Sequence, residues 1–286
     1  MRVLVLGVTG MLGSTVFKLL SESSAHEVYG TARSNTYQNY FSKDQVSKII
    51  ADVDVLNFSE LNRTIEKLKP EVIINCIGLV KQLAEVKDPL VCLPLNSMLP
   101  HQLIQVATKI NARVIHISTD CVFSGKNGHY LETDFPDAED LYGRSKYIGE
   151  LQDFKNAITL RTSIIGHELH SNRSLVDWFL SQKNNVKGFR KAIFSGLPTI
   201  EMAHIICDFV MTKPDVYGLY HVSAAPINKY DLLKLVAEVY QKQIEITPDD
   251  TVQIDRSLDS KRFTAATGYQ APAWPELIQR MYKNKI

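Results

Sequence analysis

The sequence predicts an α/β fold, a doubly wound parallel sheet of the Rossmann type with a smaller mixed α/β lobe. Two observations predict it. Short apolar runs alternate with helical patterns over residues 1–165, and a glycine-rich turn directly follows the first run. Near-continuous apolar strands that alternate with helices are typical of a parallel sheet covered on both faces. Right-handed connections between the parallel strands then place helices on both faces, which gives a doubly wound sheet.

The individual elements follow from these patterns. Apolar runs of strand length are expected to form the sheet: Val3–Leu6, Glu27–Thr31, Lys48–Ala51, Val72–Cys76, Arg113–Ser118 and Ala157–Arg161. Stretches with helical spacing are expected to cover it: Met11–Glu22, Phe58–Lys69, Pro89–Ile110 and Tyr142–Asp153.

The alternation ends after Gly166, where the chain becomes richer in aromatic residues, Asn and Lys. A strand-like run at Leu219–Ser223 and a helical pattern at Lys229–Tyr240 follow. We therefore expect residues 1–165 to form a nucleotide-binding domain and residues 166–286 to form mainly a substrate-binding lobe. A segment at about 203–225 is expected to return to the first domain.

Composition excludes several classes of function. The 286 residues carry a net charge of +1, from 32 basic and 31 acidic residues, so no basic field indicates nucleic-acid binding. The run Val3–Leu6 is too short for a signal peptide or a membrane span, which favours a cytoplasmic protein. The cysteines are far apart and lack metal-ligand spacing, so we expect reduced thiols and no metal: Cys76, Cys92, Cys121 and Cys207.

A glycine-rich turn at the amino terminus predicts a dinucleotide site. It joins the first strand to the first helix and contains Gly7, Gly10 and Gly13. Glycines at such a turn permit the tight bend, the close approach of a pyrophosphate and the packing of helix on strand. The helix amino terminus then binds the phosphates. The residues expected to contact the cofactor here are Gly7, Thr9, Gly10, Met11 and Leu12.

Arg33 distinguishes between the two nicotinamide dinucleotides. NAD sites usually place an acidic residue at the end of the second strand, where it binds the ribose 2′-hydroxyl. Here the acid is missing and Arg33 is present. A guanidinium there pairs with a 2′-phosphate, which favours NADPH over NADH. The alternative is that Arg33 is a solvated loop residue.

Two further segments are expected to line the cofactor. Asp52 and Val53, after the third strand, are predicted to lie near the adenine. Cys76, Ile77 and Gly78 follow the fourth strand and supply small, backbone-exposing residues.

The catalytic prediction rests on Tyr142 and Lys146. A spacing of four places both side chains on one helix face, and an ammonium beside a phenol lowers the phenol pKa. The tyrosine is then a proton donor or acceptor near neutral pH. Thr119, at the end of the fifth strand, lies at the edge where doubly wound folds bind ligands. The alternative is an ordinary surface pair on an amphipathic helix.

Taken together, these motifs resemble the extended short-chain dehydrogenase/reductase superfamily and, within it, the dTDP-4-dehydrorhamnose reductase family. The resemblance covers essentially the whole chain. It is carried by Gly7–Gly13, Ser118–Gly125, Tyr142–Glu150, Arg161–Ser163, Gly196–Thr199 and Arg256–Ser260.

The resemblance implies roles for individual residues. Tyr142 would protonate the alkoxide that hydride transfer creates, and Lys146 would hold the nicotinamide ribose. Thr119 would hydrogen-bond the substrate carbonyl, and Ser163 would contact the cofactor. Asn96, after a Pro94 expected to break the helix, would shape the site, the alternative being that it initiates a helix.

Position 121 bears on the reaction type. Nucleotide-sugar 4,6-dehydratases carry Asp-Glu after the threonine, as the acid and base of water elimination. Here the pair is Asp120-Cys121, and because a thiol does not readily replace a carboxyl, simple reduction is favoured.

Other departures from the rhamnose-forming reductases fall in the expected substrate pocket. Those enzymes usually have Tyr at position 121, Trp at 164, Asp-Gln at 193–194 and Arg-Pro-x-Asn-Ser at 256–260. The same reaction on another 4-keto sugar is therefore expected, such as a UDP-linked 2-acetamido-2,6-dideoxy-4-ketohexose. Arg256 is the candidate for the pyrophosphate, and Trp178 is either a base-stacking or a core residue. The expected substrate-contacting residues are Thr119, Asp120, Cys121, Ile164, Trp178, Phe194 and Arg256.

The sequence thus favours an NADPH-dependent reductase of a nucleotide-activated 6-deoxy-4-ketohexose that supplies a surface-polysaccharide precursor. Two alternatives stay open: an epimerase that retains its NAD(P), and a non-catalytic regulatory subunit that binds NADP. The nucleotide sugar is the expected partner, without nucleic acid or membrane, and a homodimer is one option for the oligomeric state.

Overall fold

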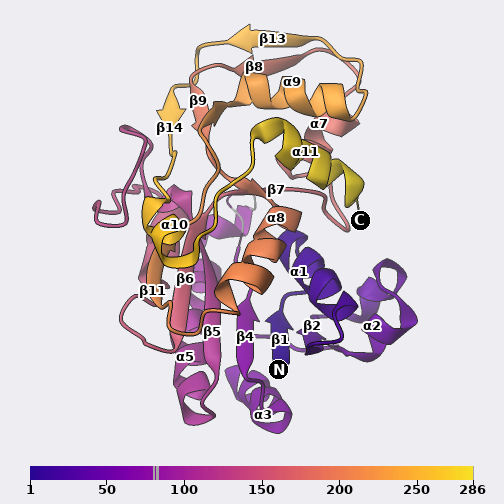
Figure 1. The fold of residues 1–286 in the computed structure, drawn as a ribbon, viewed down its shortest axis with the longest axis vertical. Coiled ribbons are helices and arrows are strands. Elements are labelled where there is room, and N and C mark those ends of the chain that lie inside the picture. The colour runs from indigo at the N-terminus through magenta and orange to yellow at the C-terminus, as the bar shows by residue number, and fades with distance from the viewer. Residues whose placement is uncertain (80, 82–83, 286) are drawn as a thin grey trace.

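A seven-stranded parallel sheet forms the centre of the molecule (Figure 1). The computed structural model describes residues 1–79, 81 and 84–285. The sheet order is β11-β6-β5-β4-β1-β2-β3, and every neighbouring pair runs parallel. This order confirms the predicted doubly wound fold. The strands are β1 (Arg2–Leu6), β2 (Glu27–Thr31), β3 (Ile49–Ile50), β4 (Val72–Asn75), β5 (Arg113–Thr119), β6 (Ala157–Thr162) and β11 (Gly218–His221).

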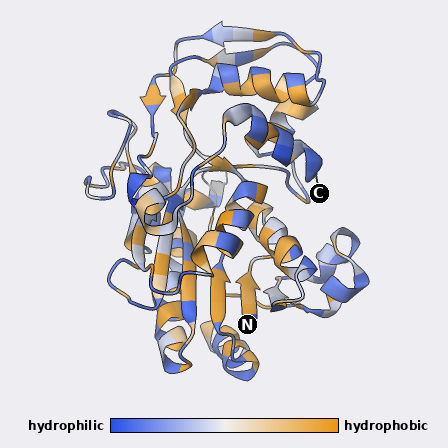
Figure 2. Ribbon diagram, in the orientation of Figure 1, coloured by the Kyte–Doolittle hydropathy of each residue, from blue (hydrophilic) through white to orange (hydrophobic). Residues whose placement is uncertain are grey.

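Both faces of the sheet are covered, because alternate residues of each strand enter different cores. On β1, Val3 and Val5 pack into one core, and Leu4 and Leu6 pack into the other. Helices α1 (Met11–Glu22) and α8 (Thr199–His204), with the π-helical turn η5 (Ile205–Val210), cover the first face. Helices α3 (Phe58–Leu68) and α5 (Leu99–Lys109) cover the second. The apolar strands in the centre of Figure 2 reflect this double burial.

The expected helix 89–110 is continuous but not regular. It consists of α4 (Pro89–Leu93), a π-helical turn η3 (Pro94–Met98) and α5. The expectation that Pro94 breaks the helix is therefore wrong. Proline removes one hydrogen bond of a regular helix, and here the backbone passes through Pro94 in the helical region while the π turn absorbs the irregularity.

Shorter helices connect these elements. They are η1 (Asn35–Tyr40), α2 (Lys43–Ser47), η2 (Ala84–Lys87), η4 (Asp120–Val122) and α6 (Leu141–Ile148). Helix α6 carries Tyr142 and Lys146 and ends earlier than the expected 142–153.

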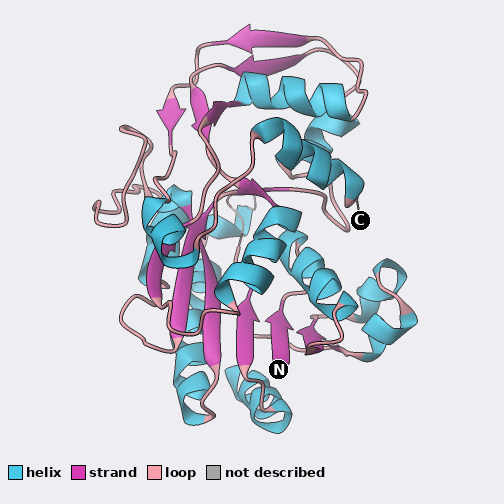
Figure 3. Cartoon of the chain, in the orientation of Figure 1, coloured by secondary structure: helices cyan, strands magenta, loops and turns pink. Residues whose placement is uncertain are grey.

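A smaller lobe lies over the carboxyl ends of the sheet strands (Figure 3). Its strands pair in three small groups: β8 (Val186–Phe189) with β13 (Ile246–Asp249), β7 (Ile164–Ile165) with β10 (Leu197–Pro198), and β9 (Ala192–Phe194) between β12 (Ile227–Asn228) and β14 (Ile254–Asp255). Its helices are α7 (Leu175–Ser181), α9 (Lys229–Val239), α10 (Lys261–Thr267) and α11 (Trp274–Lys283).

The chain passes between the sheet and the lobe more than once. Strand β11 adds to the edge of the sheet beside β6, although β7 to β10 lie between them in the sequence. The division at residue 165 stays a prediction. Among the described residues, no helix combines the length and apolar character that a membrane span requires.

Candidate active site

The glycine turn between β1 and α1 has the steric demands that its sequence predicts. Gly7 has a φ of +81°, and a Cβ there would lie 2.8 Å from Cγ1 of Ile77. A Cβ on Gly13 would overlap the carbonyl oxygen of Gly7. The Gly10 amide donates to that same oxygen at 3.0 Å. Glycine is therefore required at positions 7 and 13, and the turn joins the end of β1 closely to the start of α1.

The second half of the predicted nucleotide site lies at the ends of β2 and β3. Arg33 follows β2 and is exposed, and none of the ion pairs among the described residues includes it. Asp52 is exposed in the left-handed region with a φ of 58°, and Val53 is buried. The Val53 amide donates to the Ala32 carbonyl at 3.0 Å, so the 52–53 turn lies directly beside Arg33.

The segment after β4 connects the glycine turn with Lys146. Ile77 lies against Gly7, and a Cβ on Gly13 would lie 3.3 Å from Cβ of Cys76. On the other side, a Cβ on Gly78 would lie 3.2 Å from Oδ1 of Asn96 and 3.6 Å from Nζ of Lys146. Residues 76–78 therefore separate the glycine turn from the Lys146 ammonium.

Asn96 lies inside the π turn η3 and is fully buried. Its Oδ1 accepts from the Leu79 amide at 2.9 Å, and its Nδ2 donates to Oγ of Ser145 at 3.1 Å and to Sγ of Cys92 at 3.4 Å. The side chain thus joins the segment after β4 to helix α6. The alternative role as a helix-initiating residue is excluded, because the helix continues through it.

Lys146 is buried, and its Nζ donates to the Ile117 carbonyl at 2.7 Å. Burial lowers the pKa of this ammonium to about 8, although Glu150 acts in the opposite direction.

Thr119 and Tyr142 meet where β5 ends and α6 begins. Oγ1 of Thr119 accepts from the Cys121 amide at 3.1 Å and lies 3.2 Å from Oδ1 of Asp120. A Cβ on Gly143 would overlap the Cys121 carbonyl, so α6 starts in close contact with η4. Asp140 caps α6 by accepting from the Gly143 amide at 2.8 Å.

The expected lowering of the tyrosine pKa is wrong for this structure. Burial raises the pKa of Tyr142, and the neighbouring Cys121 and Asp120 raise it further, although a hydrogen bond with Thr119 acts in the opposite direction. The reason is that desolvation of the phenolate is the largest influence on this pKa. Tyr142 is therefore a neutral phenol.

Charged groups from both parts of the chain meet beside Thr119. Burial raises the pKa of the Asp120 carboxyl, and Arg256 and Lys229 oppose that shift. Arg256 donates from Nε to the Phe123 carbonyl at 2.8 Å and from Nη2 to the Ser124 carbonyl at 3.3 Å. Sequence reasoning missed Lys229, because no local signal connects the start of α9 with the end of β5.

The remaining predicted substrate residues have different surroundings. Phe194 is buried, with its ring 5.8 Å from that of Trp274, and its contact with substrate stays a prediction. Ile164 and Ser163 are half-buried beside β10, and the Ser163 carbonyl accepts from the Leu197 amide at 2.8 Å. Trp178 is 38% exposed on α7, which excludes the core alternative.

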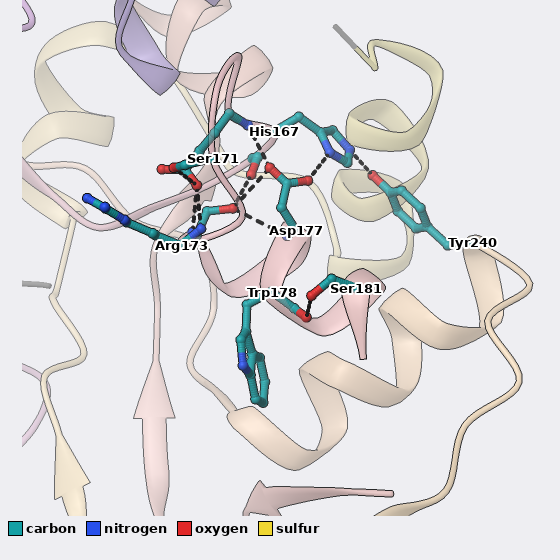
Figure 4. Close-up of polar contacts among 10 residues, drawn as sticks. His167, Ser171, Arg173, Asp177, Trp178, Ser181 and Tyr240 are labelled. Carbon is teal, nitrogen blue, oxygen red and sulfur yellow. Dashed lines mark hydrogen bonds and ion pairs between the residues drawn. The ribbon is translucent and has the colours of Figure 1, made fainter. Parts of the chain in front are cut away.

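A hydrogen-bonded network connects helix α7 with the segment that precedes it and with Tyr240 at the end of α9 (Figure 4). Nδ1 of His167 lies 2.6 Å from Oδ1 of Asp177, and its Nε2 lies 2.8 Å from the Tyr240 hydroxyl. Trp178 points away from this network. In the part of the chain that the structure describes, no three His, Cys, Asp or Glu residues gather as a metal site.

The chain is similar to characterised proteins along its whole length. The family model "RmlD substrate binding domain" matches residues 1–286. The chain is 25% identical to methionine adenosyltransferase 2 subunit beta of Rattus norvegicus over 317 residues, covering 100% of this chain and 91% of that protein. It is 26% identical to dTDP-4-dehydrorhamnose reductase of Aggregatibacter actinomycetemcomitans over 259 residues, covering 86% and 82%.

Solved structures agree on the fold. The crystal structure of dTDP-4-dehydrorhamnose reductase from Bacillus anthracis in complex with NADP has a TM-score of 0.80 at 21% identity, covering 99% of both chains. With a family model that matches every residue, this chain belongs to the RmlD substrate binding domain family.

Proposed function

We propose that this protein is an NADPH-dependent reductase of the 4-keto group of a nucleotide-activated 6-deoxy-4-ketohexose. The substrate would be dTDP-4-dehydrorhamnose-like or a UDP-2-acetamido-2,6-dideoxy-4-ketohexose, and the product a precursor of a surface polysaccharide. The observation that supports the proposal is the position of the predicted catalytic residues: Tyr142 lies within hydrogen-bonding reach of Thr119 at the end of β5, and Lys146 donates to Ile117 of the same strand. Residues 76–78 lie between Lys146 and the glycine turn.

The residues of the nucleotide site fit NADPH. Gly7 and Gly13 keep clear the space that a Cβ would fill, which suits a pyrophosphate beside the amino terminus of α1. Arg33, exposed beside Asp52 and Val53, would pair with the 2′-phosphate. Lys146 and Asn96, in contact with Gly78, would border the nicotinamide ribose. When bound, the cofactor supplies the hydride for the carbonyl carbon.

The protein's own part in the reaction is to bind and protonate the carbonyl oxygen. Thr119 would donate a hydrogen bond to it, and the neutral phenol of Tyr142 would transfer its proton as negative charge develops there. Elimination lacks a base at position 121, because burial raises the pKa of the Cys121 thiol to about 12. These properties support reduction without loss of water.

A second candidate is a regulatory subunit without turnover. It is favoured by the similarity, along the whole of this chain, to proteins named methionine adenosyltransferase 2 subunit beta. The presence of Thr119, Tyr142 and Lys146 favours catalysis. The third option, an epimerase that retains its cofactor, would convert substrate with no net consumption of NADPH.

One experiment separates these functions. The purified protein is incubated with NADPH and a panel of dTDP- and UDP-linked 4-keto sugars, while loss of NADPH absorbance and product configuration are followed. We expect NADPH loss with at least one sugar and none with the Tyr142→Phe variant. Binding of NADPH without consumption by any sugar would reject the reductase. A change in the activity of an added methionine adenosyltransferase catalytic subunit would then support the regulatory function.

A further inference from the structure

Lys229 is a cation that the lobe brings to the catalytic edge of the sheet. It is the first residue of α9 and follows β12 directly, and Asn228 caps the helix by accepting from the Asp231 amide at 2.8 Å. Arg256 follows β14 directly. Because Asn228 and Asp255 both lie opposite Ile193 of β9, the two cations leave the same small sheet on either side of its central strand.

The two cations differ in how they are held. Arg256 is fixed by its bonds to the Phe123 and Ser124 carbonyls. Lys229 is half-buried, and across residues 1–79, 81 and 84–285 its ammonium takes part in none of the ion pairs. The charged and titratable groups that act on it are Asp120, Cys121 and Arg256. Lys229 thus lies close enough to the end of β5 for Asp120 and Cys121 to act on its charge, yet it forms no ion pair with them in the described part of the chain.

The charges around Lys229 suit an anion. Partial removal of an ammonium from water is costly unless a counter-charge binds it. Asp120 supplies one negative charge near two cations, Lys229 and Arg256. Burial lowers the pKa of Lys229, with Arg256 acting in the same direction. The local excess is therefore positive, and two cations match the two negative charges of a diphosphate.

We propose that Lys229 binds the diphosphate of the nucleotide-sugar substrate together with Arg256, and so positions the sugar against Thr119 and Tyr142. This inference rests on the proposed function, since it assigns one residue of the same site to one part of the substrate. The proposal concerns the diphosphate of the substrate and not the pyrophosphate of the cofactor. The pyrophosphate of NADPH belongs to the glycine turn on the other side of residues 76–78.

The test measures binding of UDP and dTDP in the absence of turnover, by calorimetric titration of the NADPH-loaded protein. The variant is Lys229→Met, which keeps an unbranched side chain of similar shape and removes the charge. Lys234→Met is the matched control, because Lys234 lies on the same helix, is exposed and stands over the Tyr230 ring. Lys229→Arg tests rescue by charge.

We expect Lys229→Met to weaken UDP or dTDP at least tenfold, which is about 1.4 kcal/mol, with NADPH affinity unchanged. Lys234→Met should match the wild type, and Lys229→Arg should recover most of the affinity. Equal binding by Lys229→Met and the wild type would overturn the assignment, as would equal weakening by both methionine variants. Failure of the reductase proposal has a different signature, namely no NADPH consumption with any 4-keto sugar.

Discussion

Replacing Glu150 by alanine should lower the free energy of unfolding by about 3–5 kcal/mol, because it leaves a buried guanidinium without its counter-charge. Glu150 and Arg161 form a bidentate pair with both contacts at 2.7 Å, and their side chains are 0% and 1% exposed. Oε1 of Glu150 also accepts from Oγ of Ser118 at 2.8 Å. The pair therefore fastens the chain just after α6 to β5 and β6, beside Thr119.

The size of the effect follows from burial and can be checked by thermal and denaturant unfolding. For a chain of this size a loss of that magnitude corresponds to a fall in Tm of roughly 6–20 °C. The control is Glu139→Ala, because the Lys126–Glu139 pair is 70% and 78% exposed and should change stability by less than about 0.5 kcal/mol. A loss below about 1 kcal/mol for Glu150→Ala would refute the reasoning. Replacing Glu150 and Arg161 together by methionine should cost less than Glu150→Ala alone, since no charge is then left unpaired.

Three further predictions concern the site itself. Tyr142→Phe removes the proton donor and should reduce turnover by about 10²–10⁴-fold, with NADPH affinity in a binding titration nearly unchanged; full activity would reject the assignment. Arg33→Ala removes a charge-assisted hydrogen bond and should weaken NADPH by about tenfold or more, but not NADH; equal weakening of both would exclude the 2′-phosphate contact. Because the pKa of Lys146 is lowered to about 8, its positive charge is lost as pH rises through that value, and the rate should fall there; a profile flat up to about pH 10 would contradict this role of Lys146.

The sheet and the glycine turn could be predicted because their requirements are local. Most of the strands are short apolar runs that the sequence pattern predicts. In β1, β4, β5 and β6, one end of the strand agrees with the expected bound and the other differs from it by one residue. Likewise, Gly7 and Gly13 are dictated by atoms of the turn itself and of the adjacent strand end. A pattern predicts structure well when its cause lies within the same segment.

The rest of the site depends on contacts between distant segments, which no local pattern contains. Pro94 predicted a helix break, but a Cβ on Gly149 would overlap the Asn96 carbonyl, so the irregular turn is packed directly against the end of α6. Phe194 packs against Trp274, which is 80 residues away in the sequence, so its surroundings could not be predicted from its motif. Lys229 could not be connected with Asp120 before the lobe was placed over the sheet.

The raised pKa of Tyr142 bears on the choice between reductase and epimerase. A reductase needs the tyrosine only as an acid, and a phenol kept neutral by burial is fully in the donor form at neutral pH. An epimerase also needs it as a base in its first half-reaction, and burial together with Cys121 and Asp120 disfavours the phenolate. Burial therefore keeps Tyr142 in the protonated form that the first step of a reduction requires. This asymmetry supports net reduction of a ketone over a cycle of oxidation and re-reduction.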